Sequence, residues 1–157
     1  MIEQISSFFT IQMIFYWLNF GVLPFWIGLI FFPHSKFCKY IVTSFLPFLI
    51  LAGVYCYLFY LFLMTGYNFS INFTLYMGLE NLKSLFNETP FLMLFWIHFL
   101  GVNLFCGCWI VKDGQRFTIS KFILFIPLII TYFVGPIGIF IYWIVKVVRA
   151  NKISLLD

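Results

Sequence analysis

Residues 96–109 read WIHFLGVNLFCGCW and form the centre of an uncharged run from Pro90 to Val111. A helix of this length crosses the ~30 Å hydrocarbon core of a bilayer, which requires roughly 20 apolar residues. The run nevertheless holds His98 and Asn103, and polar side chains of this kind are costly at membrane depth. It therefore predicts a transmembrane helix that carries a polar site.

The composition places the whole chain in the membrane class. Of its 157 residues, 64% are hydrophobic and 9% are charged, whereas about 25% of the residues of a soluble domain are charged. The net charge of +4 is spread over short loops and the tail, so the chain offers no soluble basic face to nucleic acid. We expect a single membrane domain over residues 1–157 that contacts lipid and no nucleic acid.

The four cysteines do not form a metal-binding pattern. On a helix, Cys106 and Cys108 point about 200° apart and cannot grip one ion together. The predicted spans contain no acidic pair and no series of histidines with metal-ligand spacing. We therefore expect no metal and no cofactor.

Four segments are long and apolar enough to cross a membrane: residues 8–32, 40–64, 90–111 and 122–145. They predict an all-α integral membrane protein with four transmembrane helices. Pro24, Pro47 and the Gly135-Pro136-x-Gly138 stretch lie inside these segments, so we expect bends there. Such bends most simply set how the helices pack, and a binding role is the alternative.

Residues 65–89 connect the second and third spans and are more polar. Asn68, Ser70, Asn72 and Thr74 alternate with apolar residues, and a short amphipathic stretch then ends near Glu88. This pattern predicts a short interfacial segment, including an amphipathic helix. A fifth short span over residues 66–79 is the alternative.

The charges of the connections determine the orientation poorly. The positive-inside rule weakly favours both termini outside, because the first and third connections carry more cations than the remaining polar segments. The basic tail opposes that orientation. The two opposed sets are Lys36, Lys39, Lys112, Arg116 and Lys121 against Lys83, Lys146, Arg149 and Lys152.

His98 and Asn103 lie about 140° apart on a helix and cannot pair directly. Gly101 and Gly107 allow other helices to approach closely on both sides. We therefore expect both polar faces of this helix to pack against protein. His98 is then either a neutral hydrogen-bonding strut or a ligand contact or proton carrier.

Three further polar residues lie inside a predicted span or at its end. Gln12 and Asn19 lie inside the first predicted span, and Asp113 marks the exit of the third span. We expect Asp113 to make an exposed, energetically small contact with Lys112 or Arg116.

The stretches WIHFLGVNLFCGCWIVKDG (96–114) and FVGPIGIFIYWIVK (133–146) resemble the abscisic-acid-deficient-four-like family of membrane proteins. Its third helix typically reads W-I-H-x-x-x-x-D-L-F-x-G-R-W followed shortly by Asp, and its last helix carries G-P-x-G. The resemblance covers about residues 8–148, with Asn19 and Pro33 as weaker landmarks. The positions that this chain keeps are Trp96, Ile97, His98, Leu104, Phe105, Gly107, Trp109, Asp113, Gly135, Pro136 and Gly138.

Plant members of that family are plastid proteins required for neoxanthin formation, and bacteria have uncharacterised relatives. The resemblance implies a multi-pass protein of a bacterial inner membrane or a plastid-type membrane that binds or helps convert a carotenoid or other isoprenoid. His98 is the candidate catalytic acid–base group or polar anchor. The implied ligand-binding residues are Asn103, Asn19, Trp96, Trp109 and Asp113.

Two positions depart from the family pattern. Asn103 stands where the family usually has aspartate, and Cys108 stands where it has arginine. If those two family residues are charged partners, losing one of them alone would leave a buried ion at a cost of about 3–5 kcal/mol. The joint change indicates a structural link, and chemistry that needs the carboxylate cannot run here unchanged.

Three function classes remain. The first is an enzyme or binding protein for a carotenoid-type molecule, because epoxide isomerisation needs acid–base help but no redox cofactor. The second is a non-enzymatic binding or scaffold subunit that presents a lipid or pigment to a partner membrane enzyme, with His98 structural. The third is a small transporter or channel component, although the spans lack rows of pore-lining polar residues.

Overall fold

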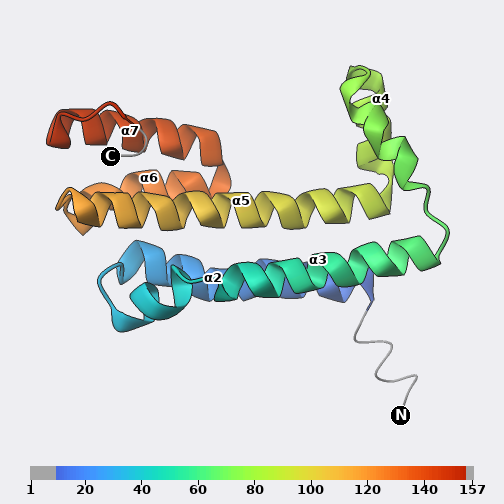
Figure 1. The fold of residues 1–157 in the computed structure, drawn as a ribbon, viewed down its shortest axis with the longest axis horizontal. Helices are drawn as coiled ribbons and strands as arrows, with labels where there is room; N and C mark the ends of the chain where they lie inside the picture. The colour runs from blue at the N-terminus through green and yellow to red at the C-terminus, as the bar shows by residue number, and fades with distance from the viewer. Residues whose placement is uncertain (1–9, 155–157) are drawn as a thin grey trace, which may run out of the picture. The chain divides into compact units, whose positions relative to one another are not determined.

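The computed structural model describes residues 10–154, and every regular element in that range is a helix. The prediction of an all-α protein is therefore confirmed for these residues. The elements, shown in Figure 1, are α2 (Ile11–Phe31), the π-helix η1 (Cys38–Val42), α3 (Leu46–Met64), the 3-10 helix η2 (Phe69–Tyr76), α4 (Leu79–Asn87), α5 (Thr89–Arg116), α6 (Lys121–Phe133) and α7 (Gly135–Ala150).

Three of the described helices, α2, α3 and α5, are long and apolar enough to cross a membrane. Pro24 lies inside α2. Pro47 does not bend a helix; it lies in the first turn of α3, where its missing N–H costs nothing. The second predicted span, residues 40–64, loses its first residues: η1 ends before Thr43, and α3 begins only at Leu46.

The predicted fourth span, residues 122–145, is wrong as a single helix. It forms α6, of 13 residues, and α7, of 16 residues, with the non-helical residue Val134 (φ −142°, ψ 86°) between them. Pro136 has no N–H to continue the hydrogen-bond ladder of α6, and it favours the first turn of a new helix.

The two short helices form a helical hairpin (Figure 1). Gly138 makes the reversal possible, because a Cβ atom at this position would overlap the hydroxyl and the backbone of Thr131. The G-P-x-G stretch, in which we expected a bend within one helix, therefore ends one helix and packs the next one against it.

The described residues divide into two compact units, and the division passes within α2, α3 and α5. Among these residues, unit 1 comprises 10–18 and 48–100, and unit 2 comprises 19–47 and 101–154. The single membrane domain over residues 1–157 stays a prediction. Each unit buries its own apolar residues, among them Ile14, Leu58, Phe62, Leu85 and Ile97 in unit 1 and Trp26, Leu29, Leu104, Leu124 and Leu128 in unit 2.

In unit 1, α4 is the short amphipathic helix that the sequence predicts. Leu85 is buried, and the ring of Phe86 packs edge-to-face on Phe95 with 4.8 Å between the ring centroids. Glu80 and Lys83 form an exposed ion pair of 2.9 Å on another face. The position of this segment at a membrane interface stays a prediction.

In unit 2, small residues of α5 let neighbouring helices approach. A Cβ atom at Gly107 would come within 2.8 Å of Trp26, and one at Gly114 would come within 2.7 Å of Leu124. Trp26 and Leu124 belong to α2 and α6, so the second half of α5 contacts both of these helices closely.

Candidate functional site

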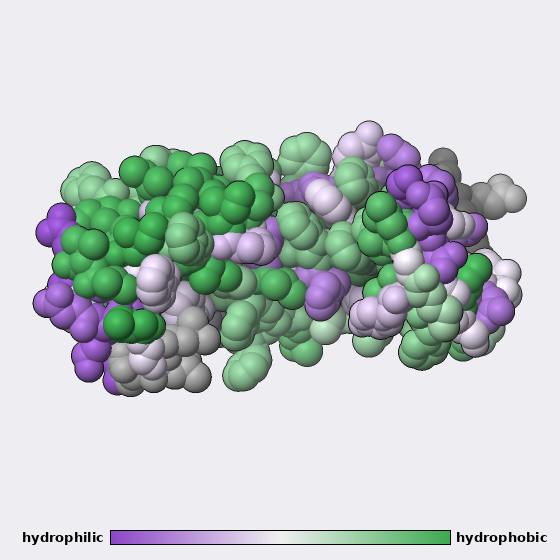
Figure 2. All heavy atoms as spheres, turned by 90° about the horizontal axis from the view of Figure 1, so that it is seen from above, coloured by the Kyte–Doolittle hydropathy of each residue, from purple (hydrophilic) through white to green (hydrophobic). Residues whose placement is uncertain are grey.

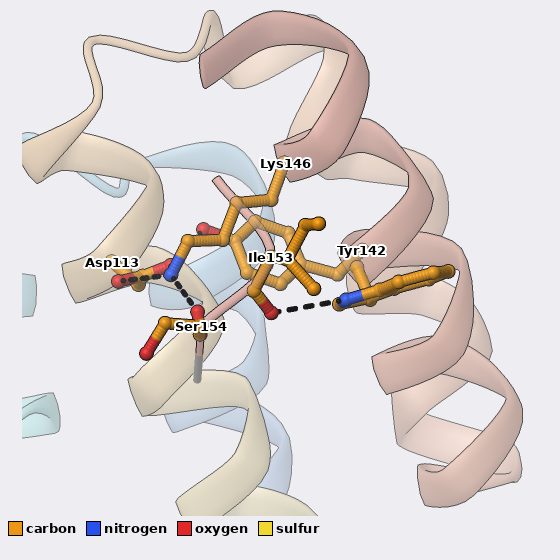
Figure 3. A network of polar contacts seen from close by, with 6 residues as sticks. Asp113, Tyr142, Lys146, Ile153 and Ser154 are labelled. Atoms are coloured by element: carbon orange, nitrogen blue, oxygen red, sulfur yellow. Dashed lines mark hydrogen bonds and ion pairs between the residues drawn. The ribbon is translucent and has the colours of Figure 1, made fainter. Parts of the chain in front are cut away.

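The most connected polar group in unit 2 lies where α5 ends beside α7 (Figure 3). Lys146 Nζ lies 3.0 Å from Asp113 Oδ2, and the Tyr142 hydroxyl donates a hydrogen bond of 2.6 Å to the same oxygen. Asp113 is 8% exposed and Lys146 is 1% exposed. Tyr142 and Lys146 are four residues apart on α7 and therefore share one helix face.

The same cluster holds the end of α7 and the chain that follows it. Lys146 Nζ also donates to the carbonyl oxygen of Ser154 at 2.9 Å, and the Trp143 indole donates to the carbonyl oxygen of Ile153 at 3.3 Å (Figure 3). Asn151 reverses the chain in a left-handed conformation, with φ of 52°. The cluster thus fastens residues 151–154 back along α7.

Trp109 contributes the apolar wall of this cluster. Its ring packs edge-to-face on Tyr142, with 5.3 Å between the ring centroids, and Lys146 Nζ lies 6.0 Å from the Trp109 ring. The structure thus brings two of the predicted site residues, Trp109 and Asp113, to the same two side chains of α7.

The expectation of an exposed contact between Asp113 and Lys112 or Arg116 is wrong. The partner of Asp113 is Lys146, 33 residues later, and it reaches Asp113 because α7 turns back after Val134. The sequence did contain one signal of a buried partner. Tyr142 and Lys146 are two polar side chains on one face of an otherwise apolar stretch.

Asn103 of α5 lies against the first residue of α7. Its side chain is buried, and a Cβ atom at Gly135 would overlap its Oδ1 atom. The first backbone N–H groups of a helix have no partner within the helix, so an amide oxygen is well placed beside them. The Nδ2 group of Asn103 has no hydrogen-bond acceptor within residues 10–154 and remains an open donor.

Asn103 and Cys108 contact different elements of unit 2. Asn103 packs on Gly135 of α7, whereas the Cys108 thiol donates to the carbonyl oxygen of Val42 at 3.4 Å. Neither of these contacts links Asn103 to Cys108, although the joint change at the two positions indicated a structural link between them.

His98 belongs to unit 1, and its side chain is exposed. No group in the described part of the chain forms a hydrogen bond with it. Leu92 and Phe95, which lie six and three residues earlier on α5, are exposed as well. The expectation that both polar faces of this helix pack against protein therefore holds for Asn103 and is wrong for His98.

The remaining predicted residues are placed separately. Trp96 is half-buried in unit 1 and stacks on Phe99, with 5.3 Å between the ring centroids. Asn19 is half-buried on α2 in unit 2. Gln12, in unit 1, donates a hydrogen bond of 3.2 Å to the Tyr16 hydroxyl. The six predicted site residues thus divide into Trp96 and His98 in unit 1 and Asn19, Asn103, Trp109 and Asp113 in unit 2.

Comparison with known proteins identifies the family. The ABA DEFICIENT 4-like family matches residues 13–142. Protein ABA DEFICIENT 4, chloroplastic, from Arabidopsis thaliana is 31% identical over 124 residues, which cover 73% of this chain and 56% of that protein. This chain thus spans little more than half the length of that relative. No solved structure matches it significantly. Because the family match covers most of its length, this chain belongs to the ABA DEFICIENT 4-like family.

Proposed function

We propose that this protein binds a carotenoid or related isoprenoid within a plastid-type membrane and assists its conversion. In this proposal, His98 is the acid–base group or polar anchor for the ligand. Membership of the ABA DEFICIENT 4-like family supports the ligand class. The observation that carries the role of His98 is its exposure in the middle of a helix that is apolar enough to cross a membrane.

The position of His98 along α5 supports access from the bilayer. It lies nine residues after Thr89, or about 14 Å along a helix of 28 residues. An exposed polar side chain at that depth is costly in hydrocarbon unless a partner covers it. A ligand dissolved in the bilayer would reach His98 without entering the protein interior, along the exposed side chains of Leu92 and Phe95.

The imidazole group fits the chemistry that this ligand class requires. Histidine donates and accepts protons near neutral pH. An epoxide-opening isomerisation gains and loses no atoms: one proton is delivered to the epoxide oxygen and one is removed from carbon. The protein would need no oxidant for this step.

Unit 2, taken by itself, also offers residues that we propose as ligand contacts. The Asn103 Nδ2 group is a buried donor without an acceptor in residues 10–154, so a hydroxyl or carbonyl oxygen would complete it. Asn19, Trp109 and Asp113 in unit 2, and Trp96 in unit 1, stay proposals as ligand contacts. Asp113 already accepts bonds from Tyr142 and Lys146, which favours a positioning role for it.

A non-enzymatic binding subunit is the second candidate function. The exposure of His98 favours a binding subunit of one kind, in which another membrane protein covers this face of α5. A strut within the chain would require an intramolecular partner for His98, and the described residues provide none.

Co-expression in a carotenoid-producing host tests the proposal. Pigments would be extracted and chromatographed from cells with the parent chain, His98→Ala and His34→Ala, the last being a matched control in an exposed loop. We expect the parent and His34→Ala to alter the pigment profile and His98→Ala to lose that change at equal protein levels. An unaltered profile with all three proteins, and no pigment in the purified parent, would contradict the proposal. Pigment retained without conversion would favour the binding subunit.

A further inference from the structure

Two contacts and one short connection bring the loops and the tail of unit 2 to one end. Gln115 Nε2 donates a hydrogen bond of 2.7 Å to the carbonyl oxygen of Pro33, which joins the end of α5 to the connection after α2. Lys146 reaches Asp113 at 3.0 Å, which joins the end of α7 to the same turn of α5. Residues 117–120 link α5 directly to α6.

This end of unit 2 is strongly cationic. Eight of the nine Lys and Arg residues belong to unit 2, and only Lys83 belongs to unit 1. Asp113 is the one acidic residue among the described residues of unit 2, and its charge is paired with that of Lys146. Hydrophilic side chains gather at this end, on the left of Figure 2. The exposed cations there are Lys36, Lys39, Lys112, Arg116, Lys121, Arg149 and Lys152.

The helices of the hairpin are too short to cross the hydrocarbon core. At 1.5 Å per residue, α6 is about 20 Å long and α7 about 24 Å, against the ~30 Å that a crossing requires. Both helices have their charged residues towards the end away from the hairpin turn: Lys121 in α6, and Lys146 and Arg149 in α7.

The turn of the hairpin is built to lie at membrane depth. Gly135 contacts Asn103, which lies 13 residues before the end of α5, or about 20 Å from it. Irregular backbone inside a membrane must have its polar groups satisfied by the protein. Val134, between the two helices, is exposed, but its N–H donates to the carbonyl oxygen of Ile130 at 2.7 Å and its carbonyl oxygen accepts from Gly138 at 3.2 Å. Gly135 is buried beside the polar side chain of Asn103.

We propose that α6 and α7 form a re-entrant hairpin, which enters and leaves the membrane on the side where α5 ends. The chain then crosses the membrane three times, and its C-terminal helix ends beside the connections at residues 32–45 and 117–120. The seven exposed cations face the anionic lipid headgroups on the side from which the chain is inserted. This arrangement removes the conflict between the loop charges and the basic tail.

Thiol labelling tests the crossing number. The full chain would be expressed in a bacterial host with His34→Cys, with Ser70→Cys or with a cysteine added after Asp157, and the parent chain gives the background of native thiols. Cells would be treated with a membrane-impermeant maleimide before and after permeabilisation. We expect Ser70→Cys to react in intact cells and the other two to react only after permeabilisation.

Two results would overturn this arrangement. Labelling of the C-terminal cysteine together with Ser70→Cys in intact cells would establish a fourth crossing and remove the hairpin. Labelling of His34→Cys and the C-terminal cysteine in intact cells, with Ser70→Cys protected, would place the cationic end on the wrong side.

Lipid analysis tests the partner. The parent, a triple variant (Lys112→Gln, Arg116→Gln, Lys121→Gln) and the control Lys83→Gln would be purified in mild detergent, and the retained phosphatidylglycerol and phosphatidylethanolamine would be measured. We expect the parent and the control to enrich phosphatidylglycerol severalfold and the triple variant to lose that enrichment. Equal ratios in all three proteins would overturn the lipid contact.

Discussion

Gly138 and Thr131 lie so close together that a Cβ atom on Gly138 would overlap both the hydroxyl and the backbone of Thr131. Thr131 is fully buried, and its hydroxyl donates to the carbonyl oxygen of Pro127 at 2.7 Å. The contact joins two helices of one hairpin, so it packs them closely together where an apolar stretch long enough to span turns back.

Gly138→Ala should therefore destabilise the hairpin. Overpacking of a tight contact costs about 1–3 kcal/mol, and here the backbone of Thr131 cannot move away as a flexible side chain would. Gly53→Ala is the matched control, because a Cβ atom at Gly53, within α3, meets nothing within 4 Å. Thermal unfolding in detergent should show a lower midpoint for Gly138→Ala and an unchanged or higher one for Gly53→Ala. Equal midpoints would contradict this close packing.

The buried Asp113–Lys146 pair should be far more sensitive to the loss of one partner than to the loss of both. Asp113→Asn or Lys146→Met alone leaves a buried charge without its partner, at a cost of about 3–5 kcal/mol. The double variant should recover a large part of that loss. Thermal unfolding of the two single variants and the double variant measures this coupling.

Glu80→Gln provides the control for this pair. It breaks an exposed ion pair with Lys83, for which solvent screening predicts a small effect. If Asp113→Asn were as mild as Glu80→Gln, Asp113 would not be the buried, charged partner of Lys146.

Asn103→Asp and Cys108→Arg should act independently. The Asn103→Asp variant would keep an oxygen beside the start of α7, where the helix dipole favours negative charge, whereas Cys108→Arg would bury a cation near Val42. We expect Asn103→Asp to be the milder change and the two effects to add within about 0.5 kcal/mol in a double-mutant cycle. Recovery of stability in the double variant would instead establish the charged pair that the family sequences indicate.

The Cys38 thiol should be unreactive while the protein is folded. Burial raises the pKa of Cys38 from 9.0 to about 11, so the folded state binds the proton more tightly than the unfolded state does. Its contribution to stability is therefore present below about pH 9 and falls as pH rises towards 11. Mass spectrometry after maleimide treatment should find Cys38 modified in denaturant and protected in the folded protein at neutral pH. Rapid labelling of the folded protein would contradict this burial.

Composition and hydropathy predicted much of the fold. Length and apolar content located α2, α3 and α5, because a membrane-spanning helix must satisfy its backbone within one long apolar stretch. The reversal at Val134 was not predictable in this way. Residues 122–145 are apolar throughout, and a G-P-x-G stretch fits a bend as well as a reversal, whereas the close contact of Gly138 with Thr131 is visible only in the folded hairpin.

The candidate site was predicted in part. The sequence singled out Asp113 and Trp109 but missed Tyr142 and Lys146, because their contact depends on a hairpin that returns α7 to α5 and brings together residues 33 positions apart. Hydropathy also could not tell which face of α5 is buried. The helix α5 carries apolar side chains on several of its faces, and His98 lies on a face that the protein leaves exposed.

The most direct test of the proposed role of His98 uses the purified protein in liposomes that contain an epoxidised carotenoid. The pigment would be extracted at intervals and chromatographed for the parent, His98→Ala and His34→Ala at equal protein content. We predict that an isomer of the same mass accumulates with the parent and with His34→Ala, and that His98→Ala forms none while it retains its thermal stability. Equal conversion by His98→Ala and the parent would contradict the assignment of His98 as the acid–base group.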